Sequence, residues 1–257
     1  MKRLTTIIAL LLPAMLFAQS QADRAPVAQE QGTVLEYITK DKDGSTKVTK
    51  QEVTSVKEED GKRIVLIKDR SIEEATAGIP PEMYDSISTI KYVITDNGWY
   101  VDYIGYISAT LKASMMAVEN ASGEEGMPEG LDITVDIGES ENPVFPISMK
   151  PGDNLSFNPI SIKVKISFIS MSSEITFERY ECTGTETVTV PAGTFETYVI
   201  EEEITNKAKA FGLSNKERQY SRTWYAPGTG DVKSQELDKK GKVISETVLN
   251  SIVKKAE

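Results

Sequence analysis

The sequence predicts a mainly β protein: a long antiparallel meander that curls into an incomplete barrel, with about one helix packed in its concave face. Alternating apolar and polar residues indicate strands with one buried face, most clearly from Ile160 to Phe168. Glycine and proline turns separate roughly eleven or twelve such strands. A twisted sheet rarely stays open beyond about ten strands, so we expect the meander to curl.

The N-terminus predicts export. Met1, Lys2 and Arg3 precede an apolar run that ends at Phe17 and Ala18, which is typical of a cleavable signal peptide over residues 1–18. The run is shorter than the roughly 20 residues that span a bilayer. Residues 19–32 are polar and without period, so we expect a flexible leader, followed by one β-rich domain over 33–254.

Three hairpins follow in the first half. Asp-Gly or Asn-Gly pairs near residues 41–44, 60–61 and 97–98 lie between β-rich runs, and such pairs favour tight hairpin turns. From Tyr106 to Asn120 the period changes: Ile107, Leu111, Met115 and Val118 recur at helical spacing, which predicts one amphipathic helix. An acidic loop over 121–130 ends this region.

The second half returns to strands. Residues 131–137 and 160–168 alternate strictly, and further strands are expected near 174–182, 185–190, 195–204, 217–225, 231–237 and 243–252. Pro143, Pro146 and the Pro151–Asp153 run predict turns between the first two of these strands.

Composition excludes several functions. The chain has 39 acidic and 29 basic residues and a net charge of −10, which disfavours nucleic acid and anionic lipid surfaces as partners. It has no histidine and one cysteine, Cys182, which excludes histidine-dependent catalysis and predicts no metal site and no cofactor. Cys182 lies far from residue 18, so we expect no lipoprotein anchor. Carboxylates remain as possible catalytic groups, but acid–base chemistry would need a pair in a cleft with at least one raised pKa. We therefore expect no enzyme.

Three motifs carry a resemblance. Pro-Gly-Asp at 151–153, Val-Pro-Ala-Gly-Thr-Phe at 190–195 and Trp-Tyr-Ala-Pro-Gly-x-Gly-x-Val-Lys at 224–233 resemble a group of secreted bacterial β-rich domains of unknown function, over about residues 140–250. The resemblance implies a fold similar to that of the LolA/LolB lipoprotein carriers, an incomplete barrel around a helix with an apolar cavity. Each motif also has a structural explanation, because glycine and proline suit turns and tryptophan suits a core.

These observations together predict an exported, non-catalytic periplasmic or secreted binding or carrier protein for an apolar ligand, such as a lipid or a lipoprotein acyl chain. The expected cavity residues are Trp99, Tyr103, Leu111, Met115, Met116, Phe168 and Trp224. The alternative is a structural or protein-interaction module of the envelope without a small-molecule ligand. Its contacts would come from a sheet edge or from acidic runs such as Glu201–Glu203.

Overall fold

The fold is a curled antiparallel sheet, as the sequence predicts. This computed structural model describes residues 21–72, 81–110, 133–166 and 169–254. Its twelve strands form one sheet in the order β5-β4-β3-β2-β1-β12-β11-β10-β9-β8-β7-β6. The strands are β1 (Thr33–Asp41), β2 (Thr46–Glu59), β3 (Lys62–Asp69), β4 (Thr89–Thr95), β5 (Gly98–Val101), β6 (Ile133–Asp136), β7 (Ile160–Ile166), β8 (Ile169–Val190), β9 (Gly193–Ala210), β10 (Leu213–Ala226), β11 (Gly230–Leu237) and β12 (Val243–Lys254).

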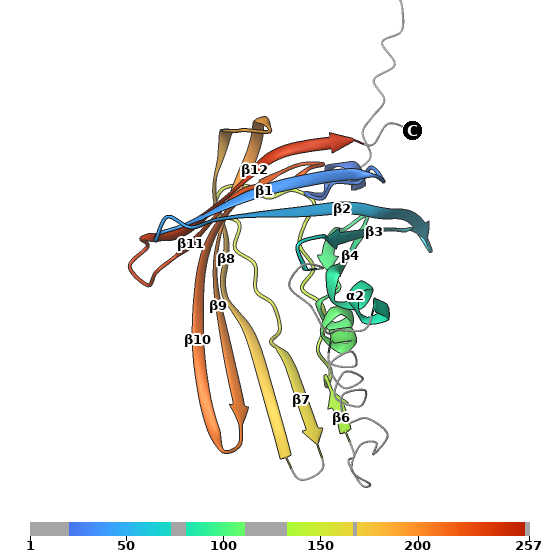
Figure 1. Cartoon of the computed structure of the whole chain (residues 1–257), viewed down its shortest axis with the longest axis vertical. Coiled ribbons are helices and arrows are strands. Elements are labelled where there is room, and N and C mark those ends of the chain that lie inside the picture. Colours follow the sequence, from blue (N-terminus) through green and yellow to red (C-terminus); the bar gives the residue numbers. More distant parts are fainter. Residues whose placement is uncertain (1–20, 73–80, 111–132, 167–168, 255–257) are drawn as a thin grey trace, which may run out of the picture.

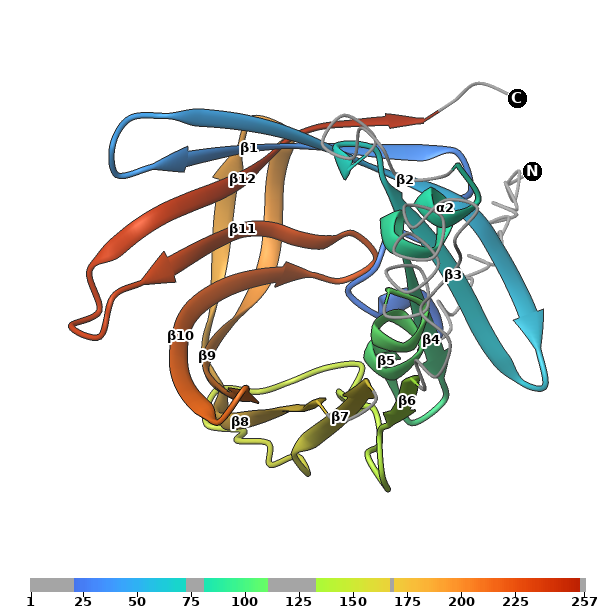
Figure 2. The same cartoon turned by 60° about the horizontal axis from the view of Figure 1, so that its bottom comes forward.

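The sheet consists of two meanders, β1–β5 and β6–β12, which meet where the first and last strands pair. Thr33 lies opposite Lys254 and Asp41 lies opposite Ser245, so this central ladder joins the two ends of the chain. Figure 2 shows the strands surrounding a central space, with β8 to β10 facing β4 and β5 across it. The buried core fills part of this space and includes Ile200 and Leu249, both fully buried.

A segment that we call the closing strap, residues 142–157, connects the β5 edge of the sheet to β8, the third strand from the β6 edge. At one end, Trp99 of β5 and Phe145 exchange two backbone hydrogen bonds of 2.8 Å. At the other, the amide of Cys182 in β8 donates to the Asp153 carbonyl at 2.8 Å. The strap can reach β8 there because β7 pairs only with the 169–175 part of that strand. The turn predicted at Pro151–Asp153 is present within the strap, where the Asp153 amide donates to the Lys150 carbonyl at 3.0 Å, and the backbone beside Phe145 pairs with β5.

Residues 21–32 pack against the sheet, which differs from the flexible leader expected from their composition. A short 3-10 helix, η1 (Ala22–Arg24), begins the segment. Ala25, Val27 and Ala28 are buried in the core, and the Gly228 amide donates to the Ala25 carbonyl at 2.9 Å. These three small apolar residues hold the segment in place because they pack into the core. The composition of the segment is dominated by the polar residues around them, so it predicted flexibility instead.

The helical elements lie beside β4 (Figure 1). Helix α2 (Pro81–Ser88) contacts β3 and β4 and was not predicted from the sequence. Its first residue is a proline, which is favourable at that position even though the Pro-Pro pair indicates a break. Residues 103–110 are helical, so the helix begins three residues before its predicted start at Tyr106, and the Asp102 carboxylate caps it by accepting from the Gly105 amide at 2.9 Å. The rest of the predicted helix lies outside the described residues.

Candidate binding cavity

A cavity of about 340 Å³ lies inside the curl of the sheet. Its size is in the range of small-molecule pockets, which are about 300–1,000 Å³. The described residues that line it come from the 21–32 segment, the closing strap and most of the strands. They are Pro26, Val27, Ala28, Leu35, Tyr37, Thr39, Thr49, Gln51, Ile67, Tyr92, Trp99, Val101, Tyr103, Phe145, Phe177, Glu202, Ile204, Tyr225, Thr229, Gly230, Asp231, Ser234 and Thr247.

Aromatic rings form one side of the cavity. Trp99 stands at their centre, with ring centroids 4.9 Å from Phe145 and 6.3 Å from both Tyr92 and Tyr225. Tyr225 stacks in turn on Tyr198 at 5.8 Å. Such offset and tilted contacts are the favoured geometries of aromatic pairs, so the rings support one another and form a firm wall.

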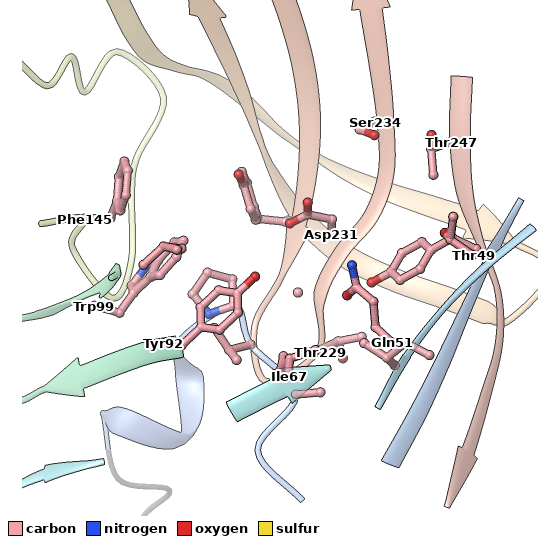
Figure 3. Close-up of a pocket in the computed structure, with 18 of the residues that line it drawn as sticks. Thr49, Gln51, Ile67, Tyr92, Trp99, Phe145, Thr229, Asp231, Ser234 and Thr247 are labelled. Carbon is pink, nitrogen blue, oxygen red and sulfur yellow. The ribbon is translucent and has the colours of Figure 1, made fainter. Parts of the chain in front are cut away.

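Hydroxyl and amide groups lie on another side. In Figure 3, Thr49, Ser234 and Thr247 stand apart from Trp99 and Phe145, with Asp231 between the two groups in this view. The Thr247 hydroxyl shares a hydrogen bond of 2.8 Å with the Thr39 hydroxyl, across the central β1–β12 ladder. The cavity is therefore amphipathic, with an aromatic side and a polar side.

Asp231 projects into this space from the start of β11. It lies opposite Tyr225, which lies opposite Tyr198 on the next strand. The Asp231 side chain is accessible within the cavity, where the aromatic and apolar lining residues limit its contact with bulk water. This enclosure removes much of the bulk water around the carboxylate and raises the pKa of Asp231 to about 6. Within the described residues, no hydrogen bond or ion pair holds the carboxylate.

Glu202 supplies a second carboxylate, from β9. Burial, assisted by the negative charge of Asp231, raises the pKa of Glu202 to about 7, while a 3.2 Å hydrogen bond from the Ser221 hydroxyl opposes this rise. Its neighbours in sequence face the other side of the sheet: Glu201 pairs with Arg222 at 2.6 Å and Glu203 with Arg218 at 2.9 Å. Strand alternation thus places two acids with arginines outside and one acid inside.

The tyrosines that line the cavity have raised pKa values, in part because of these two acids. Burial raises the pKa of Tyr37, Tyr92 and Tyr225, and the negative charge of Asp231 raises each of them further. For Tyr103, burial acts first, followed by Glu202 and then Asp231. Within the described residues, no hydrogen bond joins the hydroxyls of these four cavity tyrosines to another group. The phenol groups are therefore neutral donors and acceptors available to a bound molecule.

The residues predicted to line a cavity are placed as follows. Trp99 and Tyr103 both line it. Trp224 is buried but not among the described lining residues; its indole N–H donates to the Glu186 carboxylate at 2.7 Å, and Lys233 lies 4.9 Å from its ring. Alternation explains this, because the adjacent Tyr225 is the β10 residue that faces the cavity. Leu111, Met115, Met116 and Phe168 lie outside the described residues.

The motifs have structural roles. Gly228 has a φ of +70°, and a Cβ on it would lie 3.1 Å from the Asp23 carbonyl oxygen. It therefore permits both the β10–β11 turn and the close approach of the 21–32 segment. At the β8–β9 turn, the Ala192 amide donates to the Leu249 carbonyl of β12 at 3.2 Å, which ties this turn across the curl. Sequence reasoning missed Asp231 and Glu202, although Glu202 continues the inward series of Tyr198 and Ile200.

Fold and cavity together define a class of protein: an open, curled β-barrel, bridged by a strap, with an amphipathic cavity inside. The chain matches the family model described as DUF3108-like over residues 108–249, more than half of its length, and it belongs to this family. A comparison with the curated proteins finds no match to this sequence.

Two solved structures share the fold. One, from Bacteroides fragilis NCTC 9343, is described as a "putative exported protein with YmcC-like fold"; it has 18% identity and a TM-score of 0.52, covering 89% of this chain and 98% of its own. The other, a "putative lipoprotein" from Parabacteroides distasonis ATCC 8503, has 20% identity and a TM-score of 0.54, covering 90% and 99%. Among the described residues, no helix is long and apolar enough to span a membrane.

Proposed function

We propose that this protein is exported and acts as a non-catalytic binding or carrier protein for a small ligand with an apolar body, such as a lipid or its acyl chain. One observation carries the proposal: a cavity of about 340 Å³ whose aromatic wall is built from several elements distant in sequence. Pockets of this size and lining commonly bury most of a small ligand. The words exported protein and lipoprotein in the descriptions of the two neighbours agree with the N-terminal signal that the sequence predicts.

Native mass spectrometry tests this proposal. The protein is expressed with its N-terminal segment in a bacterial periplasm and purified without detergent, and we expect an adduct of small-molecule or lipid mass. Ser234→Phe places a ring in the cavity and should remove the adduct. Ser214→Phe, the same change at an exposed position on β10, should retain it. A clean mass for the wild-type protein, with no uptake of added fatty acid or alcohol, would contradict the proposal.

A protein-interaction role is the second candidate, and the β9–β10 hairpin favours it. Phe211 and Leu213 at its tip are 72% and 77% exposed, and Figure 1 shows the hairpin extending beyond β11, the neighbour of β10. Exposed apolar side chains that lie together are typical of contact surfaces. A photo-crosslinking residue at position 211 should then capture one specific envelope protein in the source cell, and the same residue at Val253 should not.

The two cavity carboxylates also require a test of the non-catalytic part of the proposal. Pairs of acids with raised pKa values perform acid–base chemistry in many hydrolases. We expect no turnover of glycoside or ester substrates by the wild-type protein. A hydrolytic activity that Asp231→Asn abolishes would show that the cavity is an active site.

A further inference from the structure

The charge inside the cavity selects among apolar ligands. Asp231 and Glu202 both line it, and no lysine or arginine is among the described lining residues. Glu202 accepts a hydrogen bond from the neutral Ser221 hydroxyl. By contrast, the outward acids of the same strand are paired with arginines. Strand β9 thus pairs its outward Glu201 and Glu203 with arginines, whereas the cavity carboxylates have no positive partner among the described lining residues.

A neutral apolar ligand would make this arrangement costly. It would displace water from the carboxylates and supply no hydrogen bond or charge in return, and burying an ionised carboxylate without compensation costs several kcal/mol. A ligand with a carboxylate or phosphate head would add repulsion to that cost. A ligand with a positive charge would relieve it, since its charge replaces the solvation that the carboxylates lose.

The aromatic side fits the same ligand. The faces of tryptophan and tyrosine rings carry partial negative charge and attract ammonium groups within about 6 Å. Asp231 lies beside Tyr225 in the sheet register, and Tyr225 contacts Trp99 and Tyr198 through its ring. Negative carboxylate and ring faces therefore surround one part of the cavity, while Ile67, Val101 and Leu35 provide apolar surface for the rest of a ligand.

We propose that the cavity binds an organic cation: an amphiphile whose ammonium group lies against Asp231, Glu202 and the surrounding aromatic rings, and whose apolar body fills the remaining space. This inference rests on the proposed binding function and specifies the ligand class of the same site. It excludes free fatty acids and anionic lipids as preferred ligands. The raised pKa values of the two acids agree with it, because burial without a nearby positive charge disfavours the ionised form of each carboxyl.

Three probes with the same eight-carbon chain test the inference by isothermal titration calorimetry: octyltrimethylammonium, octanol and octanoate. At pH 8 we expect the cation to bind about tenfold more tightly than octanol, and octanoate to bind most weakly. Asp231→Asn combined with Glu202→Gln should remove the advantage of the cation and strengthen octanol binding, because no ionised carboxylate then loses its water to the neutral ligand. Glu236→Gln, an exposed acid on the same strand as Asp231, is the matched control and should change nothing.

The wild-type protein provides an independent measurement if the double variant does not fold. Among the described lining residues, the titratable groups are Asp231, Glu202 and four tyrosines, and the pKa values of the tyrosines are raised above 10. Affinity for the cation should fall as the pH decreases from 8 to 5, while affinity for octanol should rise, because the two acids become protonated over this range. Equal binding of octanol and the cation at pH 8 would overturn this inference alone. Binding of none of the three probes would overturn the proposed function as well.

Discussion

Replacing Glu202 by glutamine should stabilise the protein, and only at neutral to alkaline pH. The folded protein raises the pKa of Glu202 from 4.5 to about 7. Below pH 4.5 the carboxyl is protonated in both the folded and the unfolded protein, so the folded protein keeps its full stability. As the pH rises from 4.5 through 7, the unfolded protein loses the proton more readily than the folded one, and the folded protein becomes less stable. Glutamine is neutral throughout, and its side-chain oxygen can still accept from the Ser221 hydroxyl. The advantage of the variant must therefore increase with pH.

The structure sets the size of the effect. A shift from 4.5 to about 7 corresponds to roughly 3 kcal/mol at 1.36 kcal/mol per pKa unit. Glu202 is half-buried and accessible in the cavity, so solvent screening reduces this to roughly 1–2 kcal/mol. Near pH 5 the carboxyl is mostly protonated, so wild type and variant should differ little.

Urea denaturation at pH 5, 6, 7 and 8, followed by tryptophan fluorescence, measures the free energy of unfolding of both proteins. Glu236→Gln on the exposed side of β11 is the control and should give a difference near zero at each pH. A Glu202→Gln variant that is less stable than wild type at pH 8, or whose advantage is the same at pH 5, would refute the reasoning. Such a result would mean that the ionised carboxylate is well compensated in the folded protein.

Three further outcomes follow from packing. Gly228→Val should destabilise the protein by about 1–2 kcal/mol or more in urea denaturation and make residues 21–32 sensitive to protease, because valine disfavours a φ of +70° and its Cβ would lie 3.1 Å from a carbonyl oxygen. Cys182 should react with a thiol reagent only after unfolding, since the side chain is fully buried and burial raises the pKa of the thiol; labelling of the native protein within minutes would contradict this. Leu249→Ala should cost about 2–5 kcal/mol by the same denaturation assay, whereas Val253→Ala, at a 55% exposed position, should stay within about 0.5 kcal/mol.

Local patterns were sufficient for the sheet but not for its closure. Alternation and Asp-Gly or Asn-Gly turns predict most strands and their antiparallel order, because both report on neighbouring residues. The closing strap depends instead on contacts between residues far apart, such as Trp99 with Phe145, which no local pattern encodes. Its proline-rich sequence indicates only turns.

The sequence predicts a cavity inside the curl of the sheet but identifies only some of the residues that line it. The sequence predicts an apolar cavity, whereas the cavity also has a polar side; Trp99 and Tyr103, which line it, were among the expected residues. The polar members were missed because an acidic residue in a strand normally faces solvent. Glu202 lies within a run of three glutamates, and only its position in the alternating series of Tyr198 and Ile200 distinguishes it from its neighbours. Asp231 follows a turn, so the alternation within a strand does not predict which side of the sheet its side chain faces.

The pairing of the first strand with the last governs when this protein can fold. Opposite residues of β1 and β12, such as Thr33 and Lys254, are separated by nearly the whole chain, so the central ladder has to wait for the C-terminal strand. Pairing between such distant segments is slow, and before β12 is available β1 and β11 each present an open edge. A chain truncated before Val243 would keep both edges, and it would associate with other chains rather than form a smaller barrel. A sheet whose central pairing needs the last strand suits the proposed export, because the chain cannot complete its fold before that strand is made.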